Sequence, residues 1–322
     1  MPLFCRHNRF EANCPICKSP EPDPAARRAP RSGSSSRSRS GGGTSNRSTA
    51  MRVRQAPRAA EDGYRNPLVP GLRSSADAAR LADEMAFSAA RLAALASDPP
   101  GLYAEVAAEG DPEEATWLAF LIAYLGPLEG ADPWAGVRAA RVPGSTGELT
   151  ALEDVPLGPR TSHDPERGSA TVSAYRAWVA RAGSQAASFS GEAGWTPERR
   201  FSRVFERLAL PGLSRSARFD LLVTLGRLGR YELRAESLHL SGAASDPVIT
   251  AAKRVFGIAD PLLLDRRAGD LAREAEVPLD ALDLALWNWQ EPERRSTGGV
   301  RHLATRSGAA HEALAVAAPP QS

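Results

Sequence analysis

Helix starts marked by proline constrain the fold of this chain more than any other feature of its sequence. Asp111 precedes Pro112 and Thr196 precedes Pro197, and in both pairs the first residue can cap a helix whose first turn holds the proline. Apolar residues then recur every three or four positions, whereas the alternation typical of strands does not stand out. Aromatic residues make up only 6% of the chain, which also favours helices over sheets. The sequence therefore predicts an all-α fold.

The apolar spacing predicts one helical domain over residues 74–290. Helices are expected from Ser74 or Ser75 to Pro99, from Asp111 to Gly126, around 175–179, from Thr196 to Leu208, and over 214–228, 246–256, 260–275 and 279–289. Many Gly, Pro and Ser residues predict a long loop between Arg141 and Ser169. Because the periodicity is lost near the end of the chain, residues 291–322 are expected to form a disordered tail.

Residues 19–73, which precede this domain, are rich in Pro, Ser, Gly and Arg. Such a composition buries too little apolar surface to offset chain entropy, so the segment is expected to be a disordered linker. Between Arg27 and Arg58 every charged residue is an arginine. The linker is therefore expected to add salt-dependent, sequence-independent affinity for nucleic acid.

The first 18 residues hold all 3 cysteines of the chain and one histidine in the pattern C-x-H-x6-C-x2-C. Two cysteines separated by two residues can hold one tetrahedral Zn²⁺ together with a second pair of ligands. The pattern predicts a structural zinc knuckle whose ligands are Cys5, His7, Cys14 and Cys17. A segment this short cannot build a core, so the metal would supply its folding free energy. The alternative is a reduced tail without metal.

A Leu-Pro-Gly turn at residues 210–212 lies between two apolar helices and predicts a helix-hairpin-helix. Glycine permits the tight turn, and free N–H groups at the start of the second helix can hold a DNA phosphate. The predicted DNA contacts are Gly212, Leu213, Ser214, Arg215, Ser216, Arg218 and, on the next helix, Lys253. The alternatives are a plain αα-hairpin and, for Lys253, a solvated helix face.

The run Leu210–Ser214 resembles the hairpin of the helix-hairpin-helix DNA glycosylase superfamily. The segment Asp246–Gly257 is similar to the part of these proteins that begins with a catalytic Asp. The resemblance implies that Asp246 is the catalytic carboxylate and that it acts on a nucleotide flipped out of the duplex. From the residues alone, Asp246 before Pro247 can equally be a helix cap without any catalytic role.

More narrowly, three segments together resemble the alpha-glutamyl/putrescinyl thymine pyrophosphorylase family, third clade. These segments are Leu210–Ser214, Ala251–Ile258 and Leu284–Trp289. The resemblance implies a glycosylase-like fold that takes part in thymine hypermodification in DNA. It leaves open whether the reaction breaks the glycosidic bond or transfers a group on the base.

The function expected from these features is that of an enzyme acting on a base in DNA. Two alternatives stay open: a non-catalytic nucleic-acid-binding adaptor that keeps the zinc knuckle and the hairpin, and a protein-interaction module. No apolar run approaches the roughly 20 residues that cross a bilayer, and no secretory signal stands at the start. We therefore expect a cytoplasmic protein with DNA as its partner and no membrane contact.

The zinc prediction is tested by metal analysis of the purified N-terminal peptide under reducing conditions. We expect about one equivalent of zinc per chain, because four protein ligands complete a tetrahedral site. Less than about half an equivalent would contradict the prediction.

Overall fold

Twelve helices and no strand make up the regular structure of the residues that the computed structural model describes. These residues are 59–144, 152, 154–242, 245–300, 303 and 308–316. The all-α prediction is confirmed for this part of the chain. None of its helices is both long enough and apolar enough to cross a bilayer. Cys5, His7, Cys14 and Cys17 lie outside the described residues, so the zinc knuckle stays a prediction.

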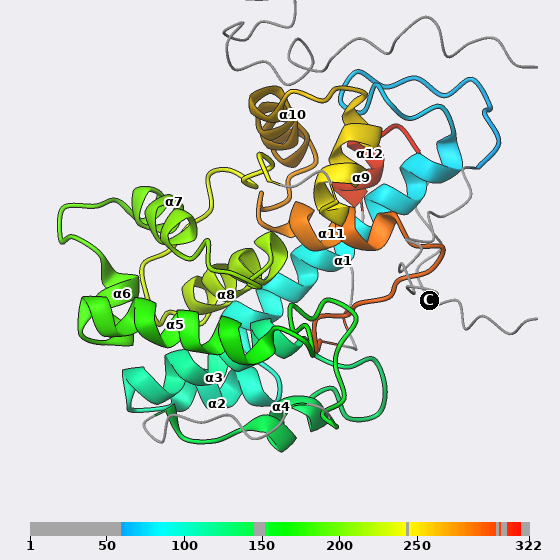
Figure 1. Ribbon diagram of the computed structural model, residues 1–322. Helices are drawn as coiled ribbons and strands as arrows, with labels where there is room; N and C mark the ends of the chain where they lie inside the picture. The colour runs from blue at the N-terminus through cyan, green and yellow to red at the C-terminus, as the bar shows by residue number, and fades with distance from the viewer. Residues whose placement is uncertain are drawn as a thin grey trace, which may run out of the picture. The chain divides into compact units, whose positions relative to one another are not determined.

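The helices follow one another along the chain as Figure 1 shows. Their bounds are α1 Ser75–Ser97, α2 Leu102–Ala108, α3 Pro112–Leu125, α4 Ala135–Ala140, α5 Gly168–Ala182, α6 Gln185–Ser190, α7 Pro197–Arg207, α8 Arg215–Arg227, α9 Pro247–Phe256, α10 Pro261–Glu274, α11 Ala281–Trp289 and α12 Gly308–Ala313. Every helix with a clear apolar repeat was predicted. The bounds agree within a few residues except for α5, which was expected only around 175–179 and begins at Gly168, inside the predicted loop. The short helices α2, α4, α6 and α12 were not predicted.

Side-chain caps fix the starts of the proline-marked helices. Asp111 accepts a hydrogen bond from the Glu113 N–H, and Thr196 accepts one from the Arg199 N–H. Asp246 and Asp260 cap α9 and α10 in the same way, each directly before a proline. These bonds satisfy N–H groups that have no partner inside the helix, so the sequence sets the helix boundaries locally.

The centre of the fold is α11, all of whose residues are buried. It packs along α1 and against α9, while α3 packs along α8. The indole N–H of Trp289 donates to the Asp77 carbonyl at 2.8 Å, which fixes α11 against the start of α1. This packing holds α9 against α11.

Residues 59–73 are part of the fold, although the sequence predicted a disordered linker as far as residue 73. Val69 and Leu72 are buried in the core. The Gly71 N–H donates to the Val255 carbonyl at 2.9 Å, and the Tyr64 hydroxyl donates to the Leu314 carbonyl at 2.6 Å. Residues 19–58 lie outside the described residues, and for them the disordered linker stays a prediction.

Residues 291–300 and 308–316 also pack against the domain, whereas the sequence predicted a disordered tail. Arg294 pairs with Glu84 of α1 at 2.8 Å. Helix α12 packs against α1, where the buried His311 lies 3.1 Å from Asp83. Residues 59–73 before the predicted domain and residues 308–316 after it therefore both add to its core. Each segment is too short to show an apolar repeat in the sequence.

The docking of residues 59–73 is tested by the substitution Gly71→Ala. A Cβ atom at this position would lie 1.9 Å from the Arg254 carbonyl oxygen. We expect a loss of about 1–3 kcal/mol in the free energy of unfolding, the usual cost of overpacking, measured by urea denaturation. Gly269→Ala is the matched control because nothing lies within 4 Å of its Cβ. It should gain about 0.5–1 kcal/mol from helix propensity. Equal stability of Gly71→Ala and the wild type would contradict the docking.

Candidate functional site

Helices α7 and α8 form the predicted hairpin, joined by the Leu-Pro-Gly turn. Gly212 has φ +76, and a Cβ there would lie 2.0 Å from the Thr171 hydroxyl oxygen, so only glycine fits. Ser214 caps α8 by accepting a hydrogen bond from the Ala217 N–H. The turn is exposed at Gly212 and Ser214 and buried at Leu213. Two helices joined by a tight turn thus lie where the sequence predicted a helix-hairpin-helix, while the identity of the motif and its contact with DNA remain predictions.

One N–H group of the turn is already bonded inside the chain. The Ser162 hydroxyl accepts from the Ser214 N–H at 2.8 Å and donates to the Gly212 carbonyl at 2.8 Å. Ser162 belongs to the segment between α4 and α5, 50 residues before the turn. The exposed turn is therefore tied to that segment.

Of the two arginines on the first turn of α8, Arg215 is buried and Arg218 is half-buried, although the sequence predicted that both add charge for a phosphate. The Arg215 guanidinium bonds to Asp246, Asp283 and the Leu238 carbonyl. Arg218 donates to the Phe205 carbonyl at 3.1 Å and lies 4.4 Å above the centre of its ring. Arg215 is therefore bonded to groups of α9 and α11, and Arg218 is bonded to the end of α7.

Ser216 and Lys253 complete the set of predicted DNA contacts. Ser216 is buried, and its hydroxyl oxygen accepts a hydrogen bond from the Arg215 guanidinium at 3.2 Å. Lys253 is half-buried on α9, seven residues beyond Asp246, which is about 10 Å along the helix. Neither lies on the exposed part of the turn.

Asp246 lies beside the start of α8, as the glycosylase resemblance requires. One carboxylate oxygen accepts from the Val248 and Ile249 N–H groups at 2.9 and 3.2 Å. The other lies 3.1 Å from the Arg215 Nε, and the side chain is 9% exposed. Asp246 is thus a helix cap and an ion-pair partner, and its catalytic role remains a prediction.

A buried chain of alternating charges continues from Asp246 into the domain. Arg215 joins Asp246 to Asp283, and the Arg160 Nη2 lies 2.7 Å from Asp283 Oδ1 and 3.2 Å from Asp220 Oδ2. We call these five residues the charge chain. Its two arginines and Asp283 have side chains that are at most 5% exposed. Removing one partner of such a buried pair leaves an unpaired charge, which costs about 3–5 kcal/mol.

The carboxylates of the charge chain differ in how they hold a proton. Burial opposes the ionisation of Asp283, but Arg215 and Arg160 outweigh it and lower its pKa. At Asp220, burial raises the pKa, and the attraction of Arg160 does not cancel it. Neighbouring carboxyl groups whose pKa values are shifted in opposite directions are suited to different steps of acid–base chemistry.

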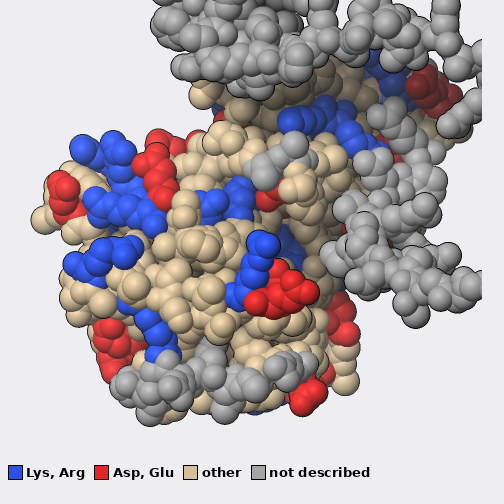
Figure 2. Space-filling model, in the orientation of Figure 1, with Lys and Arg blue, Asp and Glu red and all other residues tan. Residues whose placement is uncertain are grey.

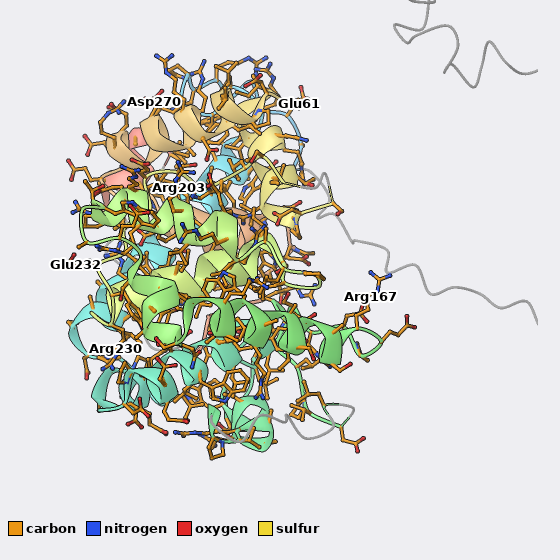
Figure 3. The ribbon with its side chains drawn as sticks, turned by 60° about the vertical axis from the view of Figure 1, so that its left-hand side comes forward. Glu61, Arg167, Arg203, Arg230, Glu232 and Asp270 are labelled. Carbon is orange, nitrogen blue, oxygen red and sulfur yellow. The ribbon has the colours of Figure 1, made fainter. Side chains whose placement is uncertain are left out.

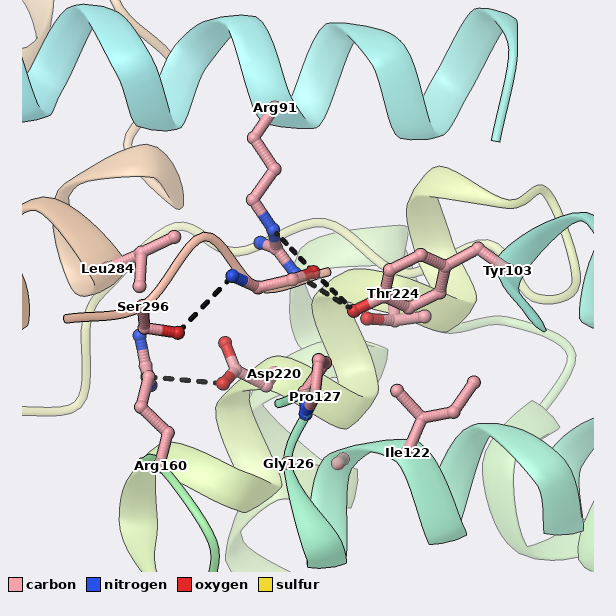
Figure 4. A pocket seen from close by; sticks show the side chains of 12 residues that line it. Arg91, Tyr103, Ile122, Gly126, Pro127, Arg160, Asp220, Thr224, Leu284 and Ser296 are labelled. Carbon is pink, nitrogen blue, oxygen red and sulfur yellow. Dashed lines mark hydrogen bonds and ion pairs between the residues drawn. The ribbon is translucent and has the colours of Figure 1, made fainter. Parts of the chain in front are cut away.

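Asp220 and Arg160 also line a small cavity, shown in Figure 4. Its other polar side chains are Arg91, Tyr103, Thr224 and Ser296, and its volume is about 20 Å³. This is room for one water molecule but not for a nucleobase. The Arg160 Nε and Nη1 are buried and have no hydrogen-bond partner within the described part of the chain. A water in the cavity can accept from Arg160 and donate to Asp220.

The sequence did not identify Arg160, Asp220 or Asp283 as site residues. A signal for two of them was nevertheless present. Asp283 is the single charged residue of the stretch Ala281–Trp289, and Asp220 stands before the apolar run Leu221–Val223. A carboxylate within an otherwise apolar helix is buried only when it is paired. Arg160 lies in a loop without periodicity and carries no such signal.

The raised pKa of Asp220 predicts how stability changes with pH. Because the folded protein disfavours the ionised carboxyl, Asp220 costs stability as the pH rises above the ordinary Asp value of about 4. The difference in unfolding free energy, wild type minus Asp220→Asn, should therefore decrease as the pH rises from acid toward neutral. Urea denaturation at several pH values measures it. A difference that is constant or increases with pH would contradict the raised pKa.

Comparison with known proteins gives one match. A family model described as alpha-glutamyl/putrescinyl thymine pyrophosphorylase clade 3 matches residues 160–297. No curated protein and no solved structure matches the chain. The matched residues are fewer than half of the chain. They begin at Arg160 and include the hairpin turn and all five residues of the charge chain. Over this part, the chain is similar to that family.

Proposed function

We propose that the chain is an enzyme that acts on a modified thymine base in DNA. One observation carries the proposal: the segment that is similar to the thymine pyrophosphorylase family is the one whose charged residues the fold gathers in the charge chain. Burying three carboxylates and two guanidinium groups is costly, and such clusters are typical of functional sites. The charge chain with its cavity is the proposed active region.

The residues of the charge chain have complementary roles in this proposal. Asp246, held by three N–H donors, pairs with Arg215 at the start of α8 and stabilises positive charge that develops on the nucleotide. Arg215 positions Asp246. At the other end, Asp220 exchanges a proton with a water or with the leaving group, because its raised pKa brings it closer to neutral pH.

We favour group transfer on the thymine substituent over cleavage of the glycosidic bond, a choice that the sequence left open. The matching family is named for alpha-glutamyl and putrescinyl thymine and for a pyrophosphorylase. The two unused N–H groups of Arg160 are donors of the kind that phosphate oxygens accept from. Since the cavity holds only one water, the substrate must open it or bind at its mouth.

A second candidate is the non-catalytic nucleic-acid-binding adaptor. It is favoured by the contacts of Asp246, whose two carboxylate oxygens are already bonded to the α9 start and to Arg215. In this case Asp246 is a structural cap, and the hairpin and the predicted zinc knuckle serve only for binding.

The substitution Asp246→Asn separates the two candidates. Asn keeps much of the capping ability and removes the charge. We expect the conversion of thymine-modified duplex DNA, followed by mass spectrometry of the released nucleosides, to fall by about 100-fold or more. Affinity for the same DNA should stay within about 3-fold, because a carboxylate makes no attractive contact with a DNA phosphate.

The matched control is Asp260→Asn, which changes another cap directly before a proline but lies outside the charge chain. It should keep full activity. From sequence, Asp246→Asn is expected to cost little stability. The ion pair to the buried Arg215 predicts a measurable loss in the free energy of unfolding instead. This loss is limited, because Arg215 still pairs with Asp283. Because the ion pair makes some loss of stability expected in both candidates, activity decides: if no wild-type activity is found on modified or unmodified DNA, the adaptor is the better description.

A further inference from the structure

Helix α7, the first helix of the hairpin, carries three exposed arginines at intervals of four residues. Arg199, Arg203 and Arg207 are all exposed, and residues four apart on a helix share one face. We call them the α7 stripe. Blue side chains gather at the upper left of Figure 2, where α7 lies in Figure 1, and Arg203 is labelled at α7 in Figure 3.

Two arginines of the α7 stripe are held in place by one indole ring. The guanidinium groups of Arg199 and Arg207 lie 5.7 and 5.1 Å from the centre of the Trp195 ring. Trp195 is itself buried, so the ring has a fixed position. Stacking orders the two arginines and still leaves their N–H groups available, which lowers the entropic cost of binding an anion.

The α7 stripe is weakly neutralised by its neighbours. Within the described residues, neither Arg199 nor Arg207 makes an ion pair. Arg203 lies 3.1 Å from Glu206, and both side chains are more than half exposed, so this pair contributes little. The nearby Glu198 is paired with Arg234 at 2.9 Å. The stripe therefore keeps most of its positive charge.

The hairpin turn, in contrast, offers little positive charge of its own. Arg215 is buried in ion pairs, Arg218 is half-buried against Phe205, and the Ser214 N–H is bonded to Ser162. A hairpin that binds DNA needs other groups for the phosphates. Helix α7 ends at Arg207 and leads directly into the exposed turn, so the stripe and the turn can follow one strand.

We propose that the α7 stripe binds the phosphate backbone of duplex DNA and positions the hairpin turn on it. Four helical residues rise about 6 Å, and one strand carries a phosphate about every 3.4 Å along its axis. Neighbouring arginines of the stripe can therefore contact every second phosphate. The inference rests on the proposed function only in taking DNA as the partner.

The experiment uses the full chain and an unmodified, fluorescein-labelled duplex, so that it needs no catalysis. The test variant is Arg199→Gln, Arg203→Gln, Arg207→Gln. The control, with the same loss of charge, is Arg266→Gln, Arg267→Gln, Arg273→Gln on the exposed face of α10. Fluorescence anisotropy gives the binding constant at several salt concentrations. A third variant replaces the stripe by lysines and keeps its charge.

In the α7 variant we expect the slope of log K against log salt to fall by about 2–3, since each lost phosphate contact contributes about 0.9. The α10 and lysine variants should keep the wild-type slope. An unchanged slope in the α7 variant, or an equal fall in the α10 variant, would overturn the proposal. So would a lysine variant as weak as the glutamine variant, because the cause would be damage to α7. Unchanged DNA binding with lost binding of polyglutamate would assign the stripe to an acidic protein instead. Loss of catalysis in Asp246→Asn affects none of these outcomes.

Discussion

The buried carboxylate of Asp283 is the interaction on which the arrangement of this domain depends. It bonds to Arg215 at the start of α8 and to Arg160 in the segment between α4 and α5. Each arginine also has a second carboxylate partner, Asp246 for Arg215 and Asp220 for Arg160, so Asp283 is the group that joins the two pairs into one buried network. α11 supplies the Asp283 carboxylate from the first turn of a mostly apolar helix. The position of the hairpin relative to α9 therefore follows from electrostatics as much as from apolar packing.

The same interaction explains why the arginines that follow the hairpin turn are not offered to solvent. In a helical hairpin that offers its basic residues to DNA, the arginines after the turn point outward. Here Arg215 is needed inside to neutralise two carboxylates, and Arg218 covers the Phe205 ring. Helix α7 buries Arg200 together with Phe201, Val204 and Phe205, and it keeps Arg199, Arg203 and Arg207 outside. The positive charge thus lies on the helix before the turn and not on the helix after it.

The sequence predicted what is encoded locally and missed what depends on distant contacts. Helix starts such as Asp111 and Thr196 were correct because a cap and a proline act within one turn. Trp287 and Trp289 stand two positions apart, a spacing that places them on different faces of a helix. Both are buried, since α11 is covered on all sides. The direction of Arg215 could not be predicted, because its partner Asp283 lies 68 residues away in the chain.

Ser162 connects the exposed turn with the interior in a way that has consequences for motion. It bonds to both sides of the turn and stands two residues after Arg160, which is fixed by Asp220 and Asp283. Two residues span at most about 7 Å, so this tether has little slack. A ligand that shifts the turn must either break the Ser162 bonds or pull on Arg160. A shift of the turn that moves Arg160 changes the proton affinity of Asp220. By thermodynamic linkage, protonation of Asp220 then changes the free energy of shifting the turn by the same amount.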